Sequence, residues 1–284
     1  MKFLFITLFP EQIEQAASHS IIQRAAKKGL LEISCINPRD FTHDVHRTVD
    51  DTPFGGGAGM VLKPEPMVAA IRKAKKQLPN ARVIAMCPGG RTLKQSIVEE
   101  YAHCGQDFIF VCGHYECFDE RIFNWVDEKL SIGDYVLTGG EMPALIVMDA
   151  IARFIPGVLG KLVSAEEDSF STGLLEYPQY TRPVNFEGLE VPEVLRGGNH
   201  ALIAAWRLQE SLKATYFLRP DLLTEEQLRM IEKPLPYKMK KAQRKFWEEL
   251  RGKIAAAKAE LAAVTEQDAE EKDTALLKED EGNG

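Results

Sequence analysis

The residues with the clearest potential for chemistry lie in a glycine-rich segment, VDDTPFGGGAGM, at residues 49–60. Glycine permits positive φ angles and close approach of a ligand to the main chain, at an entropic cost on folding. A phosphate-binding P-loop would need lysine and then serine or threonine after its last glycine, but Met60 and Val61 follow Gly59. A dinucleotide-binding turn would need a third glycine where Leu62 stands. The segment therefore indicates a loop for close ligand approach of another kind.

Cysteine and histidine offer a second possible site. The chain has five cysteines, and none forms a C-x-x-C pair, which favours reduced thiols over a disulfide framework. Cys112, His114 and Cys117 are close enough in sequence for a zinc site to be considered. However, no second ligand pair follows at finger spacing, and Cys112 ends an apolar run typical of a core strand. We therefore expect no metal site built from these residues.

The elements that must position these residues follow from hydrophobic patterning in the first 160 residues. Apolar runs alternate there with amphipathic stretches, as in β-α-β units. Strands are predicted at residues 2–9, 30–36, 81–88, 107–113 and 129–140, and helices at 10–28, 64–78, 93–103 and 142–154. Near-continuous apolar strands separated by helices predict an α/β fold, with a parallel sheet covered by helices on both faces.

Three of the predicted strands end in glycine, at residues 86–90, 112–114 and 138–140. Tight turns alone would explain one such end. In parallel sheets, however, ligands bind beyond the carboxyl ends of the strands. Three glycine-bearing ends together favour a pocket lined by main-chain amides and carbonyls.

Composition sets the wider frame. The chain of 284 residues carries a net charge of −7, but residues 265–284 hold eight acidic residues against two lysines and account for −6 of it. We expect residues 253–284 to form a helical extension followed by an acidic, disordered tail. The apolar amino-terminal run is short and lacks a cleavage site, and no segment has the length of a membrane span. A cytoplasmic protein without membrane contact is expected.

The remaining sequence predicts a linker at residues 161–174 and a small helical domain at 175–252, after a first domain at 1–160. Asn199 and Thr224 are candidate helix caps. Arginines and lysines are interleaved there with tyrosine, phenylalanine and tryptophan, a composition that suits phosphate contact and base stacking. A solvated helix face is the alternative for the basic residues at 238–245.

Motifs along the chain resemble, in order, the bacterial tRNA (guanine-N1)-methyltransferase family. They include DFTHDVHRTVDDTPFGGGAGM, CGHYECFDER, SIGDYVLTGGE, RFIPGVLG, DSF, LLEYPQYTRP and VPEVLRGGNH, and the match extends to about residue 250. The resemblance implies direct (SN2) methyl transfer from S-adenosylmethionine to N1 of the guanosine 3′ of the anticodon, at tRNA position 37. It also implies a deep trefoil knot of the SPOUT type, which no topology rule would propose. Finally, it implies a homodimer in which the linker and helical domain of one subunit complete the active site of the other, where the tRNA anticodon stem-loop binds.

The resemblance carries roles to particular residues. Asp168 matches the general base and Arg153 a cation that stabilises charge on O6 of the guanine. Asp50, Asp51 and Gly59 would lie near the target base and its 5′ neighbour. The donor would be held by Met86, Cys87, Pro88, Gly113, Tyr115, Glu116, Ile132, Gly133, Tyr135, Leu137, Gly139, Gly140 and Pro143. Magnesium dependence is implied as well, although no metal-ligand spacing is readable.

Simpler roles remain open for the two catalytic candidates. Asp168 could cap the segment after it, and Arg153 could pair with Asp149 four residues earlier. An ordinary aspartate has a pKa of about 4, far below that of guanine N1, so a catalytic Asp168 needs desolvation or a nearby cation.

One position departs from the family pattern, because Cys117 stands where glycine usually follows the HYE motif. If this position requires positive φ, a Cβ there is unfavourable by about 1–2 kcal/mol. We expect donor binding to be retained but weakened. Two other functions remain as alternatives: an RNA-binding protein of the same fold without turnover, and a nucleotide-phosphate enzyme using residues 55–59.

Overall fold

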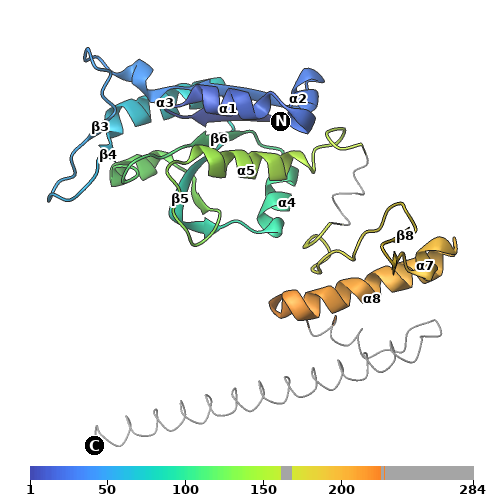
Figure 1. Cartoon of the computed structure of the whole chain (residues 1–284). Coiled ribbons are helices and arrows are strands. Elements are labelled where there is room, and N and C mark those ends of the chain that lie inside the picture. Colours follow the sequence, from blue (N-terminus) through green and yellow to red (C-terminus); the bar gives the residue numbers. More distant parts are fainter. Residues whose placement is uncertain (161–167, 225–226, 228–284) are drawn as a thin grey trace, which may run out of the picture. The chain divides into compact units, whose positions relative to one another are not determined.

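The computed structural model of the chain describes residues 1–160, 168–224 and 227. It divides into two compact units, Met1–Glu167 and Asp168–Gly284, whose elements are labelled in Figure 1. The first unit contains the large sheet.

Five parallel strands form this sheet in the order β2-β1-β6-β5-β7. The strands are β1 Lys2–Ile6, β2 Glu32–Ile36, β5 Arg82–Thr92, β6 Phe108–Val111 and β7 Glu128–Ser131. In the register of the central strands, Phe5 of β1 is paired with Phe110 of β6, and Ala85 of β5 with Val111 of β6. The predicted α/β fold with a parallel sheet is confirmed.

Helices cover both faces of the sheet. The side chains of each strand point alternately to opposite faces, and the central strands β1 and β6 are largely apolar, so both faces must be buried. Phe3 and Phe5 face a core shared with α1 Pro10–Ala17, α2 Ser20–Lys27, α4 Gln95–His103 and α5 Glu141–Ala152. Leu4 and Ile6 face a second core shared with α3 Pro64–Gln77 and the 3-10 helix η2 Glu120–Trp125. A further 3-10 helix, η1 Pro38–Phe41, lies against α3.

The helix predicted at residues 10–28 is wrong in one respect, because the chain forms two helices with a break after Ala17. The Gln15 carbonyl accepts hydrogen bonds from the Ser18 amide (3.2 Å) and hydroxyl (2.7 Å), and the His19 ring lies 2.8 Å from it. Serine side chains compete in this way with the helical hydrogen-bond pattern. Ser20 then adopts a φ of 53°, which redirects the chain into α2.

The strand predicted at residues 129–140 is also wrong in length, since β7 ends at Ser131. Gly133 has a φ of 151°, and its carbonyl accepts hydrogen bonds from the Ser131 hydroxyl (3.0 Å) and the Tyr135 amide (3.0 Å). These local bonds replace strand pairing, so residues 132–140 form a loop.

Strand β5 is longer than predicted and contains a bulge. Met86 and Arg91 both pair with Leu130 of β7, so the four residues 87–90 bulge out of the ladder. Gly90 lies so close to β7 that an added Cβ would be 2.4 Å from the Leu130 amide nitrogen. Glycine is therefore required at Gly90 by the close approach of two strands.

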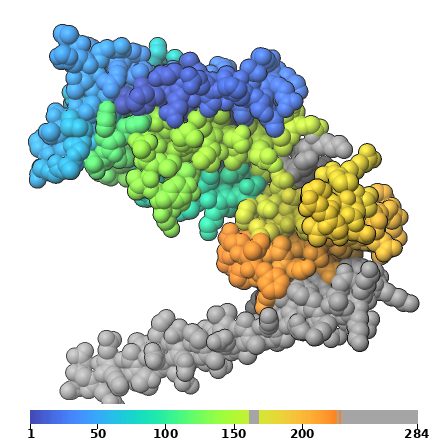
Figure 2. Space-filling model, in the orientation of Figure 1, coloured from blue at the N-terminus to red at the C-terminus, as the bar shows by residue number. Residues whose placement is uncertain are grey.

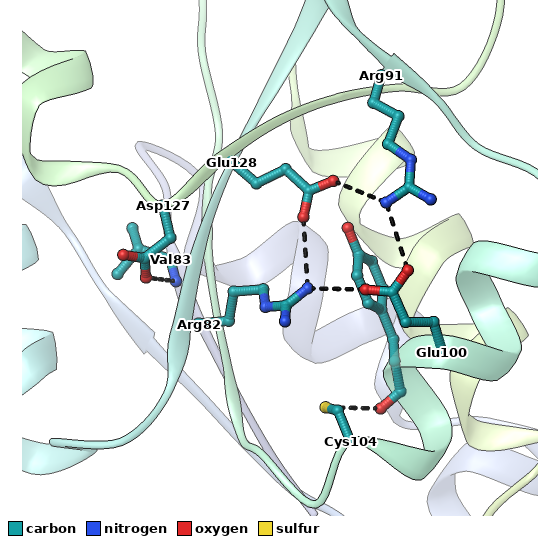
Figure 3. Close-up of polar contacts among 8 residues, drawn as sticks. Arg82, Val83, Arg91, Glu100, Cys104, Asp127 and Glu128 are labelled. Carbon is teal, nitrogen blue, oxygen red and sulfur yellow. Dashed lines mark hydrogen bonds and ion pairs between the residues drawn. The ribbon is translucent and has the colours of Figure 1, made fainter.

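Two arginines on either side of this bulge share two carboxylates (Figure 3). Arg82 Nη1 lies 3.2 Å from Glu100 of α4 and 3.5 Å from Glu128 of β7. Arg91 Nη1 lies 3.4 Å and 3.7 Å from the same two carboxylates. The hydrogen bond from Arg82, aided by the charge of Arg91, lowers the pKa of Glu100. The network thus joins both ends of the bulge to α4 and β7.

A small antiparallel ladder carries the glycine-rich segment. Strand β3 Asp50–Asp51 pairs with β4 Val61–Leu62, and the intervening loop projects from the body of the first unit (Figure 1, Figure 2). Phe54 at its tip is fully exposed.

The described part of the second unit contains a short hairpin and two helices: β8 Asn185–Phe186, β9 Leu189–Glu190, α7 Glu193–Arg196 and α8 His200–Leu218, followed by the 3-10 helix η3 Pro220–Leu222. The Asn199 side chain accepts a hydrogen bond from the Leu202 amide (3.3 Å), which confirms its capping role. Thr224 and Gln227 exchange hydrogen bonds as a capping pair. The helices predicted beyond Thr224 lie outside the described residues.

Residues 168–174, the described part of the predicted linker, pack onto this unit together with Leu175. Leu174 is buried, and the Leu175 amide donates to the Thr215 hydroxyl of α8 (2.8 Å). The Phe170 amide also donates to the Leu174 carbonyl (2.7 Å). These contacts fix the chain just after Asp168.

Candidate active site

A cavity of about 230 Å³ lies in the first unit, at the bulge of β5, beyond the carboxyl ends of β6 and β7 and beside the start of α5. This is where ligands bind in open parallel sheets. All thirteen residues predicted to hold the donor line it: Met86, Cys87, Pro88, Gly113, Tyr115, Glu116, Ile132, Gly133, Tyr135, Leu137, Gly139, Gly140 and Pro143. The structure therefore brings together residues from three separate glycine-bearing turns.

Six further residues of the lining were not predicted: His114, Cys117, Leu130, Ser131, Val136 and Thr138. Five of them lie directly beside a predicted residue in the sequence, and Leu130 lies two residues before Ile132. This closeness in sequence was the available signal.

A buried carboxylate supports the floor of the cavity and was also missed. Glu141, the first residue of α5, is 1% exposed. Its carboxylate accepts a hydrogen bond from the Thr7 hydroxyl (2.6 Å), and its other oxygen lies 2.7 Å from His114 Nε2. A helix amino terminus favours a negative charge. Glu141 therefore ties the ends of β1 and β6 to the start of α5.

Two glycines are required here by close packing. A Cβ on Gly139 would lie 2.4 Å from the His114 ring. A Cβ on Gly140 would lie 2.7 Å from the Gly113 amide nitrogen and 2.8 Å from Cys112 Cα. The Gly140 amide also donates to the Gly113 carbonyl (2.8 Å). The main chains of two cavity walls thus touch at Gly140.

The glycine-rich loop reaches the same cavity through Glu116. Gly59 has a φ of 86°, and the Glu116 side chain lies directly over its Cα, where any Cβ would collide with it. The Glu116 amide donates to the Met60 carbonyl (2.9 Å). Asp50 and Asp51 instead form the base of the loop, paired with Leu62 and Val61. Of the predicted substrate residues, Gly59 is the one in contact with the lining.

Cys117 adopts a φ of 81°, the left-handed conformation in which glycine is favoured. Burial raises the pKa of its thiol to about 11, with the neighbouring Cys87 as the next cause. The sequence-based concern about a Cβ at this position therefore applies to the observed backbone.

The two predicted catalytic residues lie in different units. Arg153 follows α5 as its C-cap, is half-buried, and is outside the cavity lining. Asp168 is half-buried at the start of the second unit. Each of the two residues is therefore described within its own unit.

Within residues 1–160, 168–224 and 227, no group of three or more His, Cys, Asp or Glu side chains could hold a metal ion. The helices in the same described stretches are too short or too polar to cross a membrane. All five cysteines are free thiols.

Comparison with known proteins identifies the family. A family model described as "tRNA (Guanine-1)-methyltransferase TrmD" matches residues 1–225. A tRNA (guanine-N(1)-)-methyltransferase of Desulfitobacterium hafniense (strain Y51) is 49% identical over 259 residues, which are 89% of this chain and 98% of the relative. The enzyme of the same name from Geotalea uraniireducens (strain Rf4) is 53% identical over 229 residues, 80% of this chain and 92% of the relative. That of Staphylococcus epidermidis (strain ATCC 35984) is 51% identical over 234 residues, 82% of this chain and 94% of the relative. The chain therefore belongs to the tRNA (guanine-N1)-methyltransferase family.

Proposed function

We propose that this protein methylates N1 of the guanosine immediately 3′ of the anticodon, at position 37 of tRNA, with S-adenosylmethionine as the donor. Family membership supports the reaction and the donor. The location of the site rests on one observation: all thirteen predicted donor residues line the cavity at the bulge of β5 and the ends of β6 and β7.

The lining suits the chemical groups of this donor. Ile132, Leu137 and Pro143 offer apolar surface for a purine ring, and Gly113 and Gly140 bring main-chain atoms into the lining. Glu116 supplies a carboxylate that would favour a positively charged sulfonium. When bound, the donor supplies an electrophilic methyl group.

Proton removal is assigned to Asp168. Neutral guanine carries a proton on N1, so the nitrogen becomes nucleophilic only as that proton leaves. Each unit of pKa mismatch between base and acid costs about 1.4 kcal/mol, so an aspartate needs help. Arg153 would give this help by stabilising negative charge developing on O6.

We further propose that residues 132–140 thread the deep trefoil knot implied by the family. Support comes from the hydrogen bond that the Gly140 amide donates to the Gly113 carbonyl (2.8 Å) in the turn after β6. A knot would explain why cavity walls far apart in sequence are in main-chain contact.

A homodimer is proposed in which the partner supplies Asp168 through residues 161–174. Large apolar side chains are exposed around the cavity of the first unit, among them Tyr115, Tyr135, Val136 and Met142. Exposed apolar clusters of this kind mark protein interfaces. The helical domain at residues 175–252 would hold the anticodon stem-loop, where Arg207 lies 4.7 Å from the ring centre of Tyr177. A cytoplasmic location follows from this substrate.

Magnesium is part of the proposal only as a property carried over from the family. The described residues contain no cluster of three side chains that could hold it. No step is therefore assigned to the metal.

The test is methyl transfer to an anticodon stem-loop, followed by mass mapping of the product. Wild-type protein is expected to methylate the guanosine at position 37 and to ignore a stem-loop carrying adenosine there. Asp168→Asn is expected to lose about 10²–10⁴-fold in turnover while donor affinity, measured by calorimetry, is unchanged. Asp221→Asn, at an exposed aspartate of the same unit, serves as the control.

Each alternative gives a different outcome. A binding protein without turnover would bind the stem-loop but transfer no methyl group. A nucleotide-phosphate enzyme would bind ATP and ignore S-adenosylmethionine in calorimetry. Full activity of Asp168→Asn would refute the assignment of the base.

A further inference from the structure

Two cysteines from different turns lie in the lining of the same cavity. Strands β5 and β6 are paired through Ala85 and Val111, so the bulge of β5, which begins after Met86, lies beside the turn that follows β6. Cys87 belongs to the bulge of β5, and Cys117 to the turn after β6. Both are half-buried free thiols. Because the two strands are paired, one thiol lies in each of two adjacent walls of the cavity.

The Cys117 side chain is held on the cavity side of its turn. Its sulfur lies 3.3 Å from the position that a Cβ on Gly113 would occupy, so the absence of a side chain at Gly113 gives it room. The nearby Cys87 thiol adds to the effect of burial in raising the pKa of the Cys117 thiol. The two sulfurs are therefore neighbours across the cavity.

The other three cysteines are differently placed. Cys112 is 1% exposed at the end of β6, Cys35 lies in β2, and the Cys104 thiol donates to the Tyr101 carbonyl after α4. None of them lines the cavity. Cys87 and Cys117 are thus the two cysteines in its lining.

We propose that Cys87 and Cys117 form a reversible disulfide by exchange with a low-molecular-weight disulfide such as oxidised glutathione, and that this bond closes the donor cavity. Disulfides in cytosolic proteins are usually transient and sense redox state. The closing effect rests on the proposed function, since it assumes that the donor binds in this cavity.

The exchange takes place in two balanced steps. The Cys87 thiolate attacks one sulfur of glutathione disulfide and releases one glutathione thiolate. Cys117 then loses its proton, attacks the Cys87 sulfur and releases the second glutathione thiolate. Two protein thiols are oxidised, one small disulfide is reduced to two thiols, and the two protons pass to the released thiolates. Burial keeps Cys117 protonated at neutral pH, which suits it to the second step.

The bond would join two walls that must stay apart for a ligand to enter. Met86 precedes Cys87 and Glu116 precedes Cys117, and both neighbours line the cavity. Drawing the bulge of β5 onto the turn after β6 would reduce the space between Met86 and Glu116. The donor site and the disulfide are therefore expected to exclude each other.

The test uses the full-length protein in glutathione redox buffers. Free thiols are alkylated, and peptide mass spectrometry maps any cross-link. A Cys87–Cys117 peptide lighter by two hydrogen atoms is expected, together with a loss of about tenfold or more in S-adenosylmethionine affinity, the scale of one good polar contact. Dithiothreitol is expected to restore the affinity. Bound S-adenosylhomocysteine is expected to slow cross-linking.

Three variants complete the experiment. The donor affinity of Cys87→Ser and of Cys117→Gly is measured before and after oxidation, and oxidation should change neither. Glycine is chosen at position 117 because it suits the φ of 81° there. Cys104→Ser, outside the cavity, should respond as the wild type does. A cross-link between other cysteines, no cross-link at any redox ratio, or a Cys87–Cys117 bond without loss of affinity would overturn the proposal.

Failure of the proposed function has a separate signature. If the reduced protein does not bind S-adenosylmethionine, the proposed donor site is refuted, while the mapped cross-link still decides whether the thiols react with each other.

Discussion

Gly140→Ala is expected to weaken both folding and donor binding, because the new methyl group would meet main-chain atoms on the facing wall. Gly140 has a φ of −83°, so alanine causes no backbone strain there. Its Cβ would, however, lie 2.7 Å from the Gly113 nitrogen, and ordinary contact begins at 3.4 Å. The two walls must therefore separate by about 0.7 Å.

The cost follows from this separation. Overpacking of a filled site costs about 1–3 kcal/mol, and stretching the 2.8 Å hydrogen bond from the Gly140 amide to the Gly113 carbonyl removes about 0.5–1.5 kcal/mol more. We expect the free energy of unfolding to fall by about 2–4 kcal/mol. Because the displaced atoms line the cavity, donor affinity should fall at least about tenfold.

Denaturation in urea and calorimetry with S-adenosylmethionine measure the two effects. Gly89→Ala is the matched control, because Gly89 lies in the adjacent bulge and an added Cβ has no atom within 4 Å. Gly140→Ser separates crowding from loss of a helix cap. Serine is a better N-cap than alanine but carries the same Cβ, so crowding predicts the same loss for both.

The reasoning would be refuted if Gly140→Ala matched Gly89→Ala in stability and affinity. Recovery of wild-type values in Gly140→Ser would also contradict it, since the loss would then come from the cap.

Three further predictions use the same structure. Gly59 and Gly55 both have a φ of 86°, so Gly59→Ala and Gly55→Ala should each lower the free energy of unfolding by about 1–2 kcal/mol. Of the two glycines, Gly59 faces Glu116, so calorimetry should show weaker donor binding in Gly59→Ala alone. Equal donor affinities of the two variants would contradict a role of the Gly59–Glu116 contact in donor binding. Glu141→Gln should lower the free energy of unfolding by about 1–3 kcal/mol, because Thr7 and His114 lose their contacts with a buried carboxylate. Urea titrations measure this loss, and in them Glu11→Gln, at an exposed position, should stay within about 0.5 kcal/mol of the wild type. Glu100 has a folded-state pKa below its ordinary value of 4.5, so its ion pairs stabilise the protein above pH 4.5 and are lost as the pH falls through the folded pKa. The difference in melting temperature between wild type and Glu100→Gln should therefore shrink on acidification below pH 4.5. A difference that stays constant would contradict the ion-pair account.

The buried strands were predictable because they depend on local composition. β1 and β6 are continuous apolar runs, and a strand covered on both faces needs little else. The three glycine-bearing ends also predicted a pocket, since strand ends meet at one edge of a parallel sheet.

Features set by contacts distant in sequence were not predictable. The loop at residues 132–140 continues an apolar pattern, but Gly133 and its local hydrogen bonds end the strand. Glu141 gains its importance from Thr7, 134 residues away, and His114, 27 residues away. Periodicity carries no information about such partners.

The glycines likewise show one feature that the sequence predicted and one that it did not. Their presence at strand ends indicated a pocket, but two different constraints act on them. Gly59 needs a positive φ, whereas Gly140 needs only the absence of a Cβ. Sequence alone gives both residues the same letter.

The bulge in β5 also restricts how this gene can change in length. The strand leaves the ladder after Met86 and returns to the same partner, Leu130, at Arg91. Side chains alternate between the two faces of a strand, so inserting or deleting a single codon between these points would move Arg91 to the opposite face and away from Glu100 and Glu128. The number of residues in the bulge is therefore expected to stay fixed.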